Sequence, residues 1–251
     1  MVEPLIVSDR MARAAVLVAT FGMLAVNGAA VAGLINGVTP DNISARFPTA
    51  ITPAGYAFTI WTAIYIGMLA FSIFQIRPSA IERFRNIRWL YVGSCVLNCA
   101  WIVFWHYALV GTCLFIIVLL NACLLVICYR LRKPTSFIAA LLTKAPFGIY
   151  FGWATCALLI NLAICLGYVG LDAQSRVLGV VLMIIAAAAA FLVRWKLSNF
   201  LYPLAIAWAL TAIAIGHSGN TSIVIAAAFT TVACLVTAGS VVTTLKDSTS
   251  E

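Results

Sequence analysis

Eight long apolar runs, separated by short polar connections, constrain this chain more than any other feature. They cover residues 12–35, 55–76, 87–107, 111–130, 145–168, 176–194, 200–216 and 221–245. A membrane-spanning helix needs about 20 apolar residues, whereas a strand of a membrane β-barrel needs only about ten, in alternation. Because hydrophobic residues make up 64% of the chain and charged residues 9%, a soluble domain is excluded. The sequence predicts an all-α integral membrane protein with eight transmembrane helices.

The basic residues support this count and predict an orientation. With eight spans, thirteen of the fifteen Lys and Arg residues fall on one side of the membrane, and only Arg46 and Arg176 fall on the other. The positive-inside rule then predicts that both termini are cytoplasmic. The thirteen are Arg10, Arg13, Arg77, Arg83, Arg85, Arg88, Arg130, Arg132, Lys133, Lys144, Arg194, Lys196 and Lys246. The net charge of +8 thus indicates a lipid bilayer as partner and no nucleic acid.

The first run has a second interpretation as a signal peptide. Arg10 and Arg13 precede it, and Ala30-Val31-Ala32 resembles a cleavage site. The run is long for a signal peptide, and its removal would break the even number of spans. We therefore interpret it as the first transmembrane helix.

Reactive groups are scarce inside the predicted spans. No Asp, Glu, Lys or Arg lies in the middle of a span, which argues against an ion-coupled pump. The eight cysteines show no metal-ligand spacing and are interpreted as packing residues. His106, near the end of the third span, is interpreted as lying in headgroup water, with contact to the metal of a ligand as the alternative. We predict no catalytic residues and no protein metal site.

Uncharged polar side chains do occur deep inside the spans. Four asparagines, Asn27, Asn98, Asn121 and Asn161, lie well within the first, third, fourth and fifth runs. An amide that faces lipid would leave hydrogen-bonding groups unsatisfied, so these side chains should face the interior of the bundle. Two roles remain open for them: hydrogen bonds between helices, and the lining of a pocket.

Aromatic residues form stripes at helical spacing on three of the same runs. The stripes are Phe58, Trp61 and Tyr65, then Asn98, Trp101 and Trp105, then Tyr150, Trp153 and Asn161. Such stripes are usually core packing. Inward-facing indole and phenol groups would also stack on a flat apolar ligand and offer it a few hydrogen bonds.

Three of these segments together resemble the TspO/MBR family, the tryptophan-rich sensory proteins related to the peripheral benzodiazepine receptor. They read ITPAGYAFTIWTAIYIGML, LNCAWIVFWHY and APFGIYFGWATCALLIN. The family's W-x-x-x-Y turn is matched by Trp61 and Tyr65, and its L-N-x-x-W signature by Asn98 and Trp101. Trp153 and Asn161 match the Trp and Asn eight residues apart in its fifth helix. The likeness covers about residues 12–168.

The resemblance implies a fold and a ligand class. Members are five-helix bundles, often dimers, that bind porphyrins, haem-related tetrapyrroles and other hydrophobic molecules in a pocket under the first loop. It implies no obligatory cofactor, with porphyrin or haem as the candidate ligand, and a role in sensing or transport; enzymatic breakdown of the ligand stays an alternative. The ligand-binding residues expected from the motifs and the stripes are Trp61, Tyr65, Asn98, Trp101, Trp153, Asn161, Phe58 and Tyr150.

We therefore predict two parts: residues 1–170 as a TspO/MBR-like five-helix domain, and residues 171–251 as an additional three-helix segment. The added helices would cover a surface that family members use to form dimers.

The long loop over residues 36–54, with its three prolines, is a candidate lid. The alternative function is that of a structural or accessory subunit, in which the stripes are packing and the chain belongs to a larger membrane complex.

Overall fold

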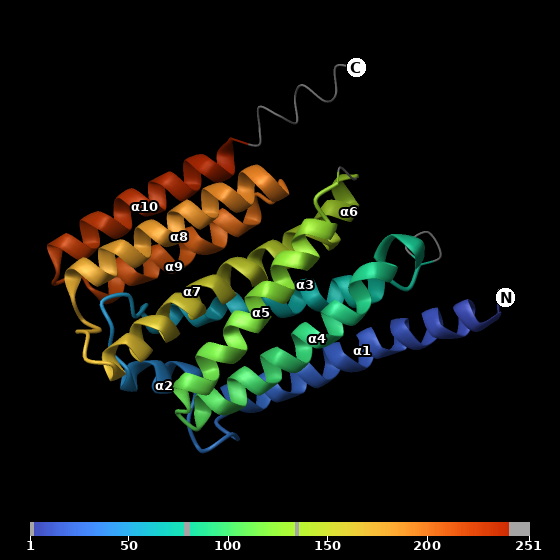
Figure 1. Ribbon diagram of the computed structural model, residues 1–251, viewed down its shortest axis with the longest axis horizontal. Coiled ribbons are helices and arrows are strands. Elements are labelled where there is room, and N and C mark those ends of the chain that lie inside the picture. Colours follow the sequence, from blue (N-terminus) through green and yellow to red (C-terminus); the bar gives the residue numbers. More distant parts are fainter. Residues whose placement is uncertain (1–2, 78–80, 134–135, 241–251) are drawn as a thin grey trace. The chain divides into compact units, whose positions relative to one another are not determined.

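The computed structural model describes residues 3–77, 81–133 and 136–240, and this part of the chain contains helices and no strand (Figure 1). The predicted all-α class is confirmed. The long helices are α1 (Glu3–Val31), α3 (Ile60–Phe74), α4 (Ile81–His106), α5 (Val110–Arg130), α7 (Lys144–Tyr168), α8 (Arg176–Leu197), α9 (Leu201–Gly216) and α10 (Thr221–Gly239). The short helices are α2 (Pro40–Arg46), η1 (Gly55–Thr59) and α6 (Phe137–Leu142).

The chain is a multi-pass integral membrane protein. Seven helical segments of the described residues are long and apolar enough to cross a bilayer, and α9 is a shorter apolar helix of 16 residues. Large apolar side chains such as Val18, Phe115 and Phe229 are exposed, as expected where lipid is the solvent. The count of eight spans stays a prediction. The end of the last predicted span, residues 241–245, and Lys246 lie outside the described residues.

Helix α1 ends four residues before the predicted end of the first span because of a glycine. Gly33 has φ +71°, a conformation that other residues rarely adopt. The amide of Leu34 donates to the carbonyl of Ala29 at 2.9 Å, and that of Gly33 donates to Ala30 at 3.1 Å. This pattern is a Schellman motif, which satisfies the last carbonyls of the helix and stops it.

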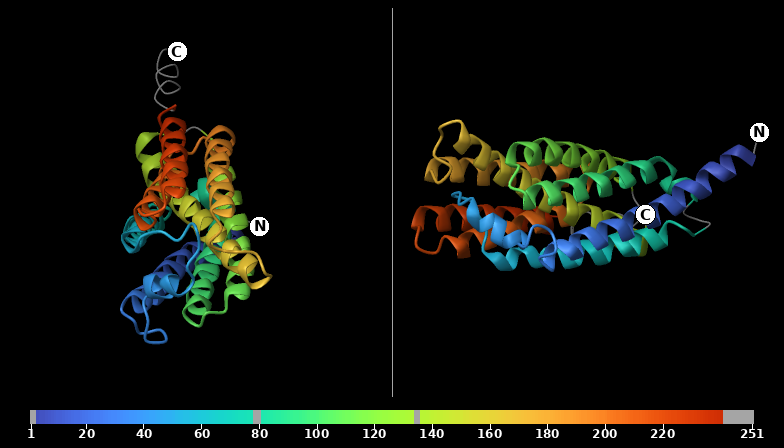
Figure 2. Two further views of the ribbon diagram at one scale, coloured as in Figure 1. Left: turned by 90° about the vertical axis from the view of Figure 1, so that its left-hand side faces the viewer. Right: turned by 90° about the horizontal axis from the view of Figure 1, so that it is seen from below.

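The described residues belong to two compact units. Unit 1 comprises Met1–Ile43 and Trp61–Phe147, and unit 2 comprises Ser44–Ile60 and Gly148–Glu251. Within unit 1, α4 packs against both α1 and α5. Within unit 2, α8, α9 and α10 lie side by side (Figure 2).

Unit 1 has an aromatic core. The ring of Phe71 on α3 contacts Phe84, Tyr91 and Phe147 edge-on, with centroids 4.9–5.6 Å apart. The hydroxyls of Tyr91 and Thr20 are hydrogen-bonded at 2.7 Å, which ties α4 to α1. These buried contacts hold α3, α4 and the start of α7 together.

Unit 2 is held by close backbone approaches. A Cβ added to Gly152 on α7 would come within 2.7 Å of the Ala205 Cβ and 2.8 Å of the Tyr202 carbonyl on α9. The hydroxyl of Tyr202 donates to that of Thr155 at 2.9 Å. Only glycine at position 152 therefore allows α7 and α9 to pack at this distance.

Candidate functional site

The expected ligand-binding residues are divided between the two units. Trp61, Tyr65, Asn98 and Trp101 belong to unit 1, and Phe58, Tyr150, Trp153 and Asn161 belong to unit 2. Four of the eight residues therefore lie in each unit. That the eight residues form one site stays a prediction.

In unit 1, flat aromatic pairs lie along two helices. On α3, the rings of Trp61 and Tyr65 are stacked, with centroids 5.4 Å apart and planes 16° apart. On α4, Trp101 and Trp105 are stacked in the same way, at 5.6 Å and 12°. A spacing of four residues places each pair on one helix face, as the stripes predict.

All four intramembrane asparagines are buried, which confirms that they face the interior. Asn27 on α1 donates from Nδ2 to the Asn98 Oδ1 on α4 at 2.7 Å, and also to the Met23 carbonyl at 2.8 Å. Asn121 and Asn161 donate to carbonyls one turn earlier in their own helices, at 2.8 and 2.9 Å. Asn98 is thus a hydrogen-bonding link between helices through its oxygen.

The side-chain nitrogen of Asn98, in contrast to its oxygen, makes no hydrogen bond to another helix. Its Nδ2 is buried and has no hydrogen-bond partner within the described part of the chain, and neither has the Nε1 of Trp101, one turn further along α4. In unit 2, the Oδ1 of Asn161 is also buried and has no hydrogen-bond partner among the described residues. Buried polar atoms are satisfied in the great majority of cases, so each exception needs an explanation.

In unit 2, Trp153 lies among apolar side chains. The ring of Phe58 meets that of Trp153 edge-on, with centroids 5.8 Å apart. Trp153 also lines a small cavity of about 20 Å³. The other lining residues come from the first loop, α7, α8 and α9, and are apolar or sulfur-containing: Ile51, Pro53, Cys156, Leu159, Ile160, Leu182, Met183, Ala186, Ala209, Leu210 and Ile213.

The first loop lines this cavity with Ile51 and Pro53 and is hydrogen-bonded to the segment before α8 and to α9. The amide of Ala50 donates to the Ala173 carbonyl, and that of Ala54 donates to the Ala212 carbonyl, both at 3.0 Å. A Cβ added to Gly179 on α8 would lie 2.7 Å from the Ala50 Cβ, so glycine permits this approach. Residues 50–54 therefore pack directly on α8 and α9. Their function as a lid stays a prediction.

A second, open depression lies beside the same loop. It has a volume of about 240 Å³ and is lined by Arg46, Phe47, Pro48, Thr49, Ile164, Gly167, Tyr168 and Ala173. The end of α7 thus faces the loop on the side where Arg46 is located.

The location expected for His106 is wrong. Its side chain is only 1% exposed, so it does not lie in headgroup water. The segment after α1 covers the end of α4, because Asn36 donates from Nδ2 to the His106 carbonyl at 2.8 Å and Trp105 donates from Nε1 to the Pro40 carbonyl at 3.4 Å. From the sequence, His106 is seen only to lie at the end of an apolar run. That the segment after α1 covers this end of α4 could not be predicted from that position.

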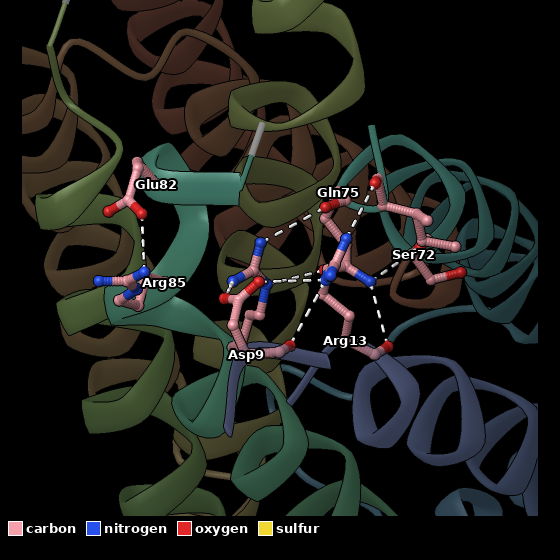
Figure 3. Close-up of polar contacts among 8 residues, drawn as sticks. Asp9, Arg13, Ser72, Gln75, Glu82 and Arg85 are labelled. Atoms are coloured by element: carbon pink, nitrogen blue, oxygen red, sulfur yellow. Dashed lines mark hydrogen bonds and ion pairs between the residues drawn. The ribbon is translucent and has the colours of Figure 1, made fainter. Parts of the chain in front are cut away.

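A buried charged network at the other end of α4 was not predicted (Figure 3). Asp9 on α1 pairs with Arg88, which is fully buried, and with Arg13 at 3.1 Å. The Nε of Arg88 donates to the Gln75 Oε1 at 2.8 Å, and the Gln75 amide donates to the Arg13 carbonyl at 3.2 Å. Helices α1, α3 and α4 are joined here by charge-assisted bonds.

The sulfur chemistry agrees with the packing interpretation. All eight cysteines have free thiols, and no group of three or more His, Cys, Asp or Glu residues able to hold a metal ion occurs among the described residues. Cys113 and Cys128 instead lie near backbone carbonyls, at 3.8 and 3.7 Å.

Comparison of this chain with known proteins gives one match, to a protein family. Searches of curated proteins and of solved structures find no match. The model of the family described as TSPO-like protein matches residues 13–241, and thus includes the three helices that follow residue 170. Because the match covers most of the 251 residues, the resemblance is confirmed, and the chain belongs to the TSPO-like protein family.

Proposed function

We propose that this protein binds a planar hydrophobic small molecule, best a tetrapyrrole, within its helical bundle, and that it senses or translocates this ligand without ion coupling. Membership of the TSPO-like family suggests a membrane receptor or translocator type of function. The eight stripe and motif residues named above would line or brace the site.

The unsatisfied buried atoms carry the proposal. Asn98 Nδ2 and Trp101 Nε1, both in unit 1, are two donors one helical turn apart. Leaving such a group unpaired costs about 1–3 kcal/mol. A ligand carboxylate or carbonyl oxygen would pair with these two donors. A porphyrin with acidic side chains combines these groups with a flat aromatic ring suited to stacked indoles.

The small volume of the cavity beside Trp153 indicates how a ligand would enter. Pockets for small molecules usually have volumes of about 300–1,000 Å³, far above the 20 Å³ beside Trp153. Binding would therefore displace residues 50–54, which pack on α8 and α9 and whose Ala50 and Ala54 amides donate to the carbonyls of Ala173, just before α8, and of Ala212 on α9. Such a closure would keep a reactive ligand away from water.

The buried charges agree with a mechanism without ion coupling. Among the described residues, Asp9 and Arg88 are the buried Asp, Glu, Lys or Arg side chains, and they pair with each other. Both lie near the start of a helix, away from the stripes. Proton or ion pathways instead use ionisable groups along the span.

Replacing Trp101 by phenylalanine tests the site. This variant keeps a ring but loses the indole donor. We therefore expect the dissociation constant for protoporphyrin to rise about tenfold to a hundredfold, which corresponds to the loss of one hydrogen bond to a charged group. Quenching of tryptophan fluorescence measures the binding. Trp89→Phe, on the same helix and 59% exposed, is the matched control and should bind like the wild type. Equal affinity of the wild type and Trp101→Phe would contradict the proposed role of this indole.

We also propose that α9 spans the membrane, which completes eight crossings and places both termini on the cytoplasmic side. Its 16 residues measure about 24 Å at 1.5 Å per residue, close to the 30 Å hydrocarbon thickness. In a variant without native cysteines, Ser198→Cys and Ser218→Cys, one at each end of α9, should react with an impermeant thiol reagent from opposite sides. Labelling of both from one side would contradict an eighth crossing.

A further inference from the structure

The open depression beside the first loop lies entirely within unit 2. Its lining residues come from the end of α2, the first loop, the end of α7 and the segment before α8. Its volume of about 240 Å³ equals that of about eight water molecules at 30 Å³ each. The depression therefore has room for a phosphate group with a few carbon atoms attached.

The lining of the depression contains one charged group, which is a cation. Arg46 is exposed and forms no ion pair with another described residue. Asp172, next to the lining residue Ala173, instead accepts a hydrogen bond from the Gln174 amide at 2.9 Å. A guanidinium presents a planar fork of donors that fits two oxygens of a phosphate. The depression thus favours an anion, and its lining offers no carboxylate to a cation.

The rest of the lining is mostly apolar, and it lies where a membrane span ends. The apolar segment Phe137–Tyr168 is long enough to cross a bilayer, and Tyr168, its last residue, is 70% exposed. Tyrosine is typical of the level of the lipid headgroups. Phe47, Pro48 and Ile164 line the same depression. A molecule with an anionic head at this depth and an apolar body that continues into the hydrocarbon is a phospholipid.

The depression and the small cavity beside Trp153 share the first loop. Thr49 lines the depression, and Ile51 lines the cavity. Ala50 lies between them, and its amide donates at 3.0 Å to the carbonyl of Ala173, which also lines the depression. A molecule in the depression therefore touches both segments that this hydrogen bond joins, and would stabilise the loop where it is.

We propose that the depression binds the headgroup of an anionic phospholipid, with the phosphate on Arg46 and the glycerol against Phe47, and that the bound lipid holds the first loop on unit 2. None of the eight residues proposed for tetrapyrrole binding lines this site. Phosphatidylglycerol brings a single negative charge, which pairs with Arg46. Phosphatidylcholine also brings an ammonium group, for which the lining has no partner, so phosphatidylglycerol should bind more tightly.

Native mass spectrometry of the full-length protein with phosphatidylglycerol or phosphatidylcholine tests the site. We expect Arg46→Gln to weaken the binding of phosphatidylglycerol about tenfold, because a bidentate contact between arginine and phosphate is lost, and to remove the preference over phosphatidylcholine. Arg176→Gln is the matched control, since Arg176 is also exposed but lies outside the lining. This variant should bind like the wild type, and an equal concentration of inorganic phosphate should not displace the lipid.

Hydrogen exchange of the protein in lipid nanodiscs gives a second readout, for the loop. The peptide that contains the Ala50 amide should exchange more slowly in phosphatidylglycerol than in phosphatidylcholine. Arg46→Gln should remove this difference, and Arg176→Gln should keep it. Protoporphyrin takes no part in either experiment, so their results are independent of the proposed function.

Three results would overturn the proposal. Equal losses of affinity in Arg46→Gln and Arg176→Gln would show general attraction to a charged surface rather than a site. Displacement of the lipid by inorganic phosphate would make the occupant a free anion. Equal exchange of the Ala50 peptide in both lipids would show that a bound lipid does not hold the loop.

Discussion

Replacing Asp9 by alanine is expected to lower the free energy of unfolding by about 3–5 kcal/mol. The carboxylate is the charged partner of Arg88, whose guanidinium is fully buried. Removing one member of a buried pair leaves the other charge without compensation, which costs far more than the pair contributes when intact. Unfolding of the purified protein in mixed detergent micelles, followed by circular dichroism, measures the change.

An exposed ion pair on α4 supplies the control for that prediction. Arg85 and Glu82 are linked at 2.7 Å, with side chains 45% and 76% exposed. Exposed pairs of this kind contribute at most about 1 kcal/mol, so Glu82→Ala should unfold almost like the wild type. Equal losses in Asp9→Ala and Glu82→Ala would contradict the assignment of the buried network as a brace between α1, α3 and α4.

Replacing Trp153 by alanine should destabilise unit 2 by about 3–5 kcal/mol, the usual cost of removing a large buried ring. The ring lines the small apolar cavity and contacts Phe58, so its loss would enlarge that cavity by the volume of an indole. Apolar cavities of such a size stay dry and bind small aromatic molecules. Free indole should therefore raise the unfolding temperature of Trp153→Ala and leave that of the wild type unchanged.

The matched control for this cavity is Trp195→Ala. Trp195 lies on α8 and is 64% exposed, so its replacement should cost little, and indole should not restore stability. An equal effect of indole on both variants would show binding to the outer surface rather than to the cavity beside Trp153.

The spacing of the apolar residues and the positions of the polar ones predicted most of the fold, because a chain surrounded by lipid can adopt few structures. An amide has to face the interior of a bundle, and all four asparagines do. The apolar runs predicted the middle helices closely, whereas α1 begins nine residues and α4 six residues before the predicted run. Two local features were also readable and were not used: Gly33, which ends α1, and the Thr39-Pro40-Asp41 sequence that begins α2, since proline and an acidic residue suit the first turn of a helix.

Other features depend on contacts between residues far apart in the sequence. Asp9 and Arg88 are separated by 79 positions, and no local pattern connects them. The end of α4 at His106 is covered by a distant segment, in which Asn36, 70 positions away, donates to the His106 carbonyl. The stripes identified Asn98 and Trp101, but only the packing reveals which of their polar atoms lack a partner. For the same reason, the sequence did not reveal that α8 and α9 hold the first loop.

A structure of the protein with bound protoporphyrin tests the central claim most directly. We predict a ligand oxygen about 3 Å from both Asn98 Nδ2 and Trp101 Nε1, a normal hydrogen-bond distance, with the stacked indoles against the porphyrin ring. A ligand bound elsewhere, with these two nitrogens still unpaired, would contradict the claim. The stripes would then be packing between helices, as expected of an accessory subunit in a larger membrane complex.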